Sequence, residues 1–81
     1  MIVFSDESGN RNSIGYKDFA KIYLEHYGFL EESGFVVNVI LLLDDWEKKK
    51  NLKFDRIMPS DWNLLLKAVK VLNVDQPILF S

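Results

Sequence analysis

One stretch of the chain, residues 34–46, is apolar on every side and long enough to run through a hydrophobic core. It reads Gly-Phe-Val-Val-Asn-Val-Ile-Leu-Leu-Leu-Asp-Asp-Trp. Most side chains in residues 36–40 are β-branched, and they favour a strand because such side chains lose rotamer freedom in a helix. A strand over residues 35–43 that is apolar on both faces is expected in the middle of a sheet covered on both sides, usually a parallel one.

The same stretch also matches a helix over residues 35–50. Its apolar side chains recur at helical spacing as far as Trp46, and residues 44–50 have acids first and lysines last, as a helix prefers. Periodicity alone does not separate a buried strand from a buried helix in a run of this kind. We predict the strand, followed by a short helix near residues 45–50, and keep the long helix as the alternative.

Two further segments predict amphipathic helices. Residues 16–27 place apolar side chains at helical spacing, with Ser13 as a candidate N-cap and Gly28 as a glycine that ends the helix. Residues 61–72 follow the same pattern after Ser60, and Asn73 is placed to stop the second helix.

Short apolar runs at residues 2–5 and 77–80 predict two more strands, and the segment after the first run, as far as Ser13, is expected to be a loop. The predicted fold is therefore of the α/β class, with a three-stranded, mostly parallel sheet from residues 2–5, 35–43 and 77–80 covered by two or three helices. An all-α helical bundle that contains residues 35–50 as its buried helix is the alternative.

Composition limits the class of protein. With 81 residues, of which 48% are hydrophobic and 27% charged, the chain is expected to form a single globular domain, residues 1–81. It has no cysteine, which excludes disulfides and thiolate metal ligands and suits a reducing, cytoplasmic location. The longest apolar run ends at Asp44, well short of the ~20 residues that cross a membrane. We expect no membrane partner.

The charges argue against a nucleic-acid partner. Ten basic and twelve acidic residues give a net charge of −2, so no strong positive field surrounds the protein. A local basic segment, residues 48–56, is interpreted as a solvated helix end. The only histidine, His26, lies near the end of the first predicted helix and is interpreted as a surface residue.

Four acidic side chains could form a metal site if the predicted strands run parallel. Asp6 and Glu7 follow the first strand, and Asp44 and Asp45 follow the second, so all four would lie at the edge where open α/β sheets bind ligands. Oxygen clusters of this type bind Mg²⁺. No general base or phosphate-binding loop completes such a site, so we interpret these acids as helix caps and turn residues and predict no metal, no cofactor and no catalytic residues.

Aromatic residues are the stronger indication of function. The chain has six Phe, three Tyr and two Trp, more than a small core is expected to bury. Exposed aromatic side chains close to acids are typical of contact surfaces. The predicted partner-binding residues are Tyr27, Phe29, Asp44, Asp45, Trp46 and Trp62.

The order of the predicted elements resembles that of the barstar family of small ribonuclease inhibitors. The likeness lies in an opening strand, a first helix ending at Tyr27 and Gly28, an apolar strand with a Trp-containing short helix, a further helix and a last strand. The resemblance implies an inhibitor of a secreted ribonuclease. Only residues 29–33 separate Gly28 from Gly34, however, so there is no room for the acidic inhibitory helix of that family and no inhibitor residue is carried over.

A shorter likeness concerns the start of the chain. Residues 2–10, Ile-Val-Phe-Ser-Asp-Glu-Ser-Gly-Asn, are similar to the opening of a larger nuclease-like family whose first strand ends in Asp-Glu-Ser-Gly. Nothing downstream extends this likeness.

The sequence thus predicts a small non-enzymatic protein-binding module, such as an inhibitor, immunity or adaptor protein, that uses exposed aromatic and acidic residues. Its partner would be another protein or a second copy of the chain. A small metal-dependent enzyme of the phosphoryl-transfer or nuclease type, with clustered Asp residues, is one alternative. A homo-oligomeric structural protein is the other.

Overall fold

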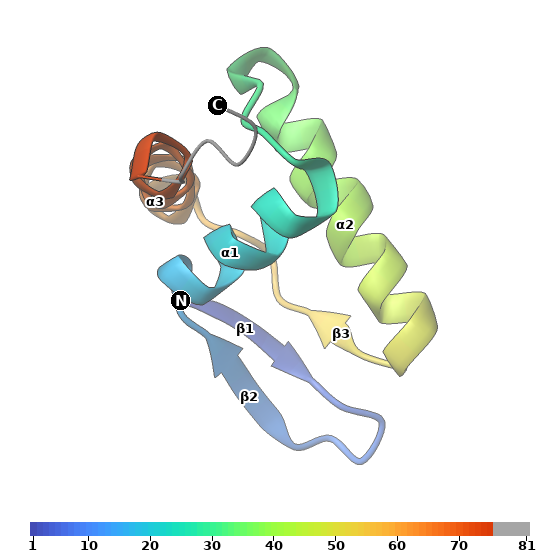
Figure 1. Cartoon of the computed structure of the whole chain (residues 1–81). Helices are drawn as coiled ribbons and strands as arrows, with labels where there is room; N and C mark the ends of the chain where they lie inside the picture. The colour runs from blue at the N-terminus through green and yellow to red at the C-terminus, as the bar shows by residue number, and fades with distance from the viewer. Residues whose placement is uncertain (76–81) are drawn as a thin grey trace.

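A computed structural model describes residues 1–75 of the chain, and the predicted strand at residues 77–80 lies outside the described residues. Three helices gather on one side of a small sheet (Figure 1). In chain order the elements are β1 (Ile2–Ser5), β2 (Arg11–Ile14), α1 (Tyr16–Tyr27), a 3₁₀ turn η1 (Glu32–Gly34), α2 (Phe35–Lys50), β3 (Lys53–Phe54) and α3 (Pro59–Asp75).

The sheet corrects the predicted topology. Its strand order is β2-β1-β3 and both pairings are antiparallel, whereas the sequence predicted a mostly parallel sheet. Ile2 lies opposite Ile14, and Phe4 lies opposite both Asn12 and Phe54. The prediction was wrong because the central strand it relied on is not a strand, and the alternative of a helical bundle is also wrong because a sheet is present.

A tight turn joins β1 to β2 and allows them to pair in antiparallel orientation. The Asp6 carboxylate accepts hydrogen bonds from the backbone N–H groups of Ser8 and Asn10, both at 2.9 Å, and Gly9 adopts a φ of 85°. Aspartate and glycine favour turns for these reasons. The predicted loop as far as Ser13 therefore includes a strand, β2, that returns along β1.

Residues 35–50 form one continuous helix, α2, which is the alternative that the sequence left open. The predicted strand at residues 35–43 is therefore wrong, and the predicted short helix near residues 45–50 is the last part of α2. β-branched residues cost only a few tenths of a kcal/mol each in a helix. Packing outweighs that preference, since α2 buries Phe35, Val39, Leu42 and Leu43 against the other elements.

The prediction of α1 is confirmed over its whole length. Its N-cap residue is Gly15, not Ser13, which lies in β2. Gly28 ends it as predicted, with a φ of 83° and an N–H group that donates to the Leu24 carbonyl at 2.6 Å. Glycine reaches this left-handed conformation without steric cost.

The second predicted helix is confirmed with wider bounds. α3 begins at Pro59, whose fixed φ suits a first helical turn, and it continues through Asn73. α1 packs against α3, and the Tyr16 hydroxyl group donates a hydrogen bond to the Asp61 carboxylate at the start of α3. This hydrogen bond, together with burial, raises the pKa of the Tyr16 phenol.

The core lies between the three helices and the sheet, and each of these elements supplies buried side chains. They are Ile2, Phe19, Ala20, Tyr23, Leu24, Phe35, Val39, Leu42, Leu43, Leu65 and Val69. Among residues 1–75, no helix combines the length and the apolar character needed to cross a membrane.

Candidate functional site

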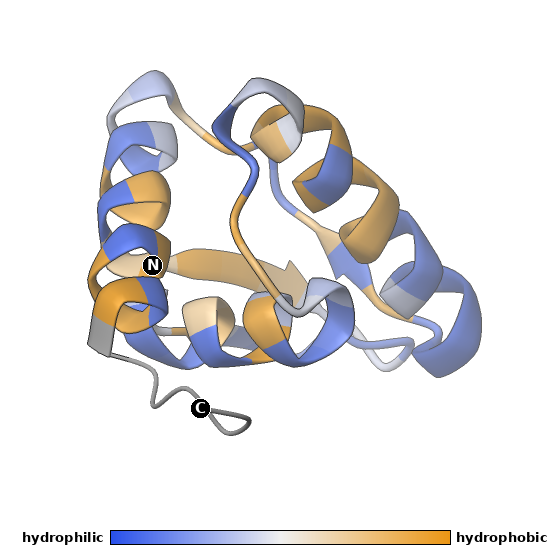
Figure 2. Cartoon of the chain, turned by 45° about the horizontal axis from the view of Figure 1, so that its top comes forward, coloured by the Kyte–Doolittle hydropathy of each residue, from blue (hydrophilic) through white to orange (hydrophobic). Residues whose placement is uncertain are grey.

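The outer side of α2 exposes apolar side chains on two successive turns. We call this surface the α2 face; its residues are Val36, Val37, Ile40 and Leu41. Between 47% and 61% of each side chain is exposed. Figure 2 shows the same pattern along the ribbon, with hydrophobic residues through the first part of α2 and hydrophilic residues through its end. Contiguous apolar surface of this kind marks interaction sites more often than isolated apolar residues do.

Helical spacing explains why these side chains remain outside. A helix in a small domain needs to bury only one face, and α2 already buries four side chains. Residues three and four positions apart form rows on a helix. One row, Ile40, Leu43 and Glu47, faces α3 and β3, and the next row, containing Val37 and Leu41, is more exposed.

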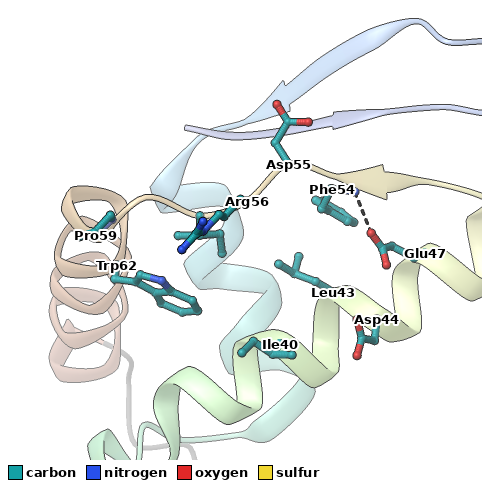
Figure 3. Close-up of a pocket in the computed structure, with 10 residues that line it drawn as sticks. Ile40, Leu43, Asp44, Glu47, Phe54, Asp55, Arg56, Pro59 and Trp62 are labelled. Carbon is teal, nitrogen blue, oxygen red and sulfur yellow. Dashed lines mark hydrogen bonds between the residues drawn. The ribbon is translucent and has the colours of Figure 1, made fainter.

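A cleft of about 450 Å³ lies beside the α2 face, between α2, α3 and the connection that joins β3 to α3. We call it the α2–α3 cleft. Its apolar lining residues are Ile40, Leu43, Phe54, Ile57, Pro59 and Trp62, and its charged lining residues are Asp44, Glu47, Asp55 and Arg56. In Figure 3, the Trp62 indole on α3 lies across the hollow from Ile40 and Leu43 on α2. The cleft thus has an apolar centre with an aromatic wall.

Two of the charged groups in the cleft already have partners. The Glu47 carboxylate accepts a hydrogen bond from the Phe54 N–H group at 2.8 Å, and Asp55 forms an ion pair with Arg11. Asp44 and Arg56 are both exposed, and neither forms an ion pair within the described part of the chain. They extend from different walls, Asp44 from α2 and Arg56 from the β3–α3 connection (Figure 3).

The structure brings together two of the six predicted contact residues. Asp44 and Trp62 both line the α2–α3 cleft. Phe29 is 60% exposed in the turn after α1 and does not line this cleft. Trp46 is half-buried, with its ring edge-on to Phe19 at a centroid distance of 6.2 Å and tilted against Phe54 at 5.7 Å. Trp46 therefore packs against the core.

The other two predicted residues, Tyr27 and Asp45, lie where α2 approaches α1. The half-buried Tyr27 donates a hydrogen bond from its hydroxyl group to the Asn38 carbonyl at 2.8 Å. Burial is the main cause that raises the pKa of the Tyr27 phenol, and Tyr23 and Asp45 add electrostatic contributions. Asp45 forms an ion pair with Lys49 one turn along α2, at 3.1 Å. The Tyr27 hydrogen bond thus joins α1 to α2, whereas the Asp45 ion pair lies within α2.

The sequence did not predict the α2 face or the role of Arg56 in the cleft. The sequence predicts a buried strand at residues 35–43, which places none of their side chains at the surface. A signal was present, because an all-round apolar helix in a domain of 81 residues must leave one side uncovered. Arg56 gave no comparable signal, since its position depends on how the β3–α3 connection crosses the cleft.

The four acids that could have formed a metal site, Asp6, Glu7, Asp44 and Asp45, do not lie at one edge of a parallel sheet. Asp6 lies in the β1–β2 turn and its carboxylate accepts two backbone hydrogen bonds, while Asp44 and Asp45 lie on α2. The expected edge of parallel strands does not exist, since the sheet is antiparallel. Within residues 1–75, no three His, Cys, Asp or Glu side chains are grouped so that they could hold a metal ion.

A second hollow, of about 540 Å³, lies between the start of α1 and the outer side of α3. Its apolar lining includes Leu64, Ala68, Val71 and Leu72. It contains none of the six predicted contact residues, and it provides a comparison surface for the experiments below.

Comparison with known proteins adds no relative. No protein-family model matches this sequence, and no curated protein and no solved structure matches it either.

Proposed function

We propose that this chain is a small non-enzymatic protein-binding module that contacts its partner through the α2 face and the adjoining α2–α3 cleft. The observation that supports the proposal is the exposure of four apolar side chains on two successive turns of α2, next to a cleft with a Trp62 wall. Removing apolar surface from water contributes about 25 cal/mol per Å². A partner that covers this helix would therefore gain affinity from side chains that the fold leaves exposed.

The α2–α3 cleft adds a pocket for an anchoring side chain and charged groups at its rim, which an exposed apolar helix face alone does not provide. Tryptophan and arginine are over-represented among residues that dominate binding energy, and pockets near the centre of an interface accept anchoring side chains from a partner. Charged groups at the rim favour the correct orientation and suppress wrong partners. Trp62, Asp44 and Arg56 offer these features together around one apolar centre.

An inhibitor, immunity or adaptor role belongs to the same proposal. The resemblance in element order to the barstar family first suggested this class, but the apolar strand on which it relied is a helix in the structure, so the proposal does not rest on it. The absence of cysteine suits a role in the reducing cytoplasm. The binding surface proposed here rests on α2 and α3 and takes no residue from that family.

The test is capture of partners with a tagged form of the chain, in a cell that also makes an untagged copy. Leu41→Glu places a charge in the middle of the α2 face, at a side chain that is 56% exposed. Val71→Glu is the matched control, because Val71 is 52% exposed and lines the second hollow instead. We expect Leu41→Glu to lose most of the captured protein, whether another protein or the untagged copy, and Val71→Glu to retain it.

Thermal melting of both variants checks that each is folded. Equal capture by Leu41→Glu and the unsubstituted protein would contradict the proposal. Loss of capture with Val71→Glu alone would move the binding surface to the second hollow.

A further inference from the structure

We infer that the partner of the α2 face is a second copy of this chain, in a closed dimer with two-fold symmetry. The inference rests on the proposed function, since it names the partner of the same surface. In such a dimer the same patch of each copy meets the other copy, so that every contact occurs twice. The patch must therefore be complementary to itself in both shape and charge.

The shape condition is met because a ridge and a hollow lie side by side on the same surface. Val37 and Leu41 form the ridge on α2, and Ile40, on the next row of the helix, lines the α2–α3 cleft. Ridges on one helix pack into grooves on another. A two-fold axis near Ile40 lets the ridge of each copy enter the cleft of the other. The Trp62 side chain of each copy is then covered by the other copy.

The charge condition is met by Asp44 and Arg56. They have opposite charges, are both exposed, and extend from different walls of the cleft. Neither has an ion-pair partner within residues 1–75, whereas the other two acids of the cleft lining are engaged. In a symmetric pair, Asp44 of each copy can face Arg56 of the other, which gives two equivalent ion pairs between copies.

The remaining charges do not oppose the pairing. The chain carries a net charge of only −2, so long-range repulsion between two copies is small. Apolar centres with polar rims are typical of homodimer interfaces. The α2 face and the cleft, with Asp44 and Arg56 at the side, form this arrangement.

The first experiment measures the mass of the purified protein by sedimentation velocity, from about 5 µM to about 500 µM, because a dimer dissociates on dilution. We expect the protein to reach the dimer mass within this range and to stop there. Leu41→Glu should remain a monomer throughout, while Val71→Glu should dimerise like the unsubstituted protein.

The second experiment reverses the two charges, separately and together. Because of the symmetry, Asp44→Arg or Arg56→Asp alone changes two attractions into two repulsions, and each should weaken dimerisation at least about tenfold. The double variant Asp44→Arg/Arg56→Asp restores two opposite-charge pairs and should recover most of the lost affinity. A merely misfolded single variant would not be rescued in this way.

Several outcomes would overturn the inference. They are a monomer at every concentration, growth beyond the dimer, dimerisation that survives Leu41→Glu, and a double variant no better than the single ones. A monomeric protein whose capture of another protein still depends on Leu41 would refute the second copy and leave the proposed function standing. A monomeric protein with no Leu41-dependent capture would refute both.

Discussion

The two helices α1 and α2 bury the same number of side chains and differ on the sides that face away from the core. α1 buries Phe19, Ala20, Tyr23 and Leu24, and its outward positions are mainly charged. α2 also buries four side chains, but the first half of its outer side is apolar and half-exposed. Figure 2 makes the contrast visible, because α1 alternates between hydrophilic and hydrophobic residues while the first half of α2 is mostly hydrophobic, with Asn38 as its one polar residue.

The difference separates two demands on a sequence. Folding requires one apolar face per helix, and α1 supplies that and little more. The additional apolar side chains of α2 contribute less to the isolated fold than its buried ones, since water still covers about half of each. Their exposure is the observation on which we propose α2 as the binding element, whereas the outer side of α1 offers no comparable apolar surface.

The largest expected effect contrasts two neighbours on α2. Leu42 is 1% exposed and Leu41 is 56% exposed. Leu42→Ala leaves a cavity in the core and should lower the free energy of unfolding by about 2–5 kcal/mol. Leu41→Ala should change it by less than about 0.5 kcal/mol. Urea unfolding at a concentration where the protein is monomeric measures both, and equal losses would remove the distinction between the two sides of α2.

The next effect concerns how the two helices end. α1 ends at Gly28 with a φ of 83°, and a β-carbon there would meet no atom within 4 Å. Gly28→Ala should therefore cost about 1–2 kcal/mol through backbone strain alone. α2 ends at Asn51 with a φ of 52°, so Asn51→Gly should leave stability unchanged or slightly raised. Thermal unfolding compares the two, and a neutral Gly28→Ala would show that α1 does not depend on this local stop signal.

The smallest effect lies between the two helices. Tyr27→Phe removes the hydrogen bond from α1 to the Asn38 carbonyl on α2 and should cost about 0.5–1.5 kcal/mol at neutral pH. Because folding raises the pKa of the Tyr27 phenol above 10.0, its contribution is fully present below pH 10. That contribution is lost as the pH rises through the raised pKa.

The pH dependence can be measured by following stability between pH 9 and pH 12. Tyr27→Phe should make the decline less steep, and Tyr16→Phe should do the same for the second tyrosine whose pKa is raised. A decline that is equally steep in both variants would show that other groups control the alkaline transition.

The sequence predicted α1 to the residue because every signal for it is local. Its apolar residues follow one helical face, and Gly28 marks the end in a conformation that glycine adopts easily. α3 was predicted for the same reason, though Asn73 proved to be no stop. In each case, neighbouring residues contain the information that the helix needs.

The prediction failed where the answer depended on residues far away in the chain. Residues 35–43 satisfy both a strand and a helix, and the choice falls to packing against β3 and the core side chains of α1. The predicted parallel sheet and the predicted cluster of Asp6 with Asp44 both depended on this strand, so they were wrong as well. Of the predicted contact residues, only Asp44 and Trp62 line the α2–α3 cleft. The cleft forms only when α2 and α3 pack in the tertiary structure, so the sequence alone could not place the other residues relative to it.

The sequence by itself determined that the chain is a small cysteine-free domain with two amphipathic helices and a central apolar segment too long for its size. It also indicated that a core of this size cannot bury every aromatic side chain, while it predicted residues 35–43 as buried. Only the tertiary structure decided which apolar side chains remain in water. Burial of one side of α2 leaves Val36, Val37, Ile40 and Leu41 facing outward, and the approach of α3 adds Trp62 beside them.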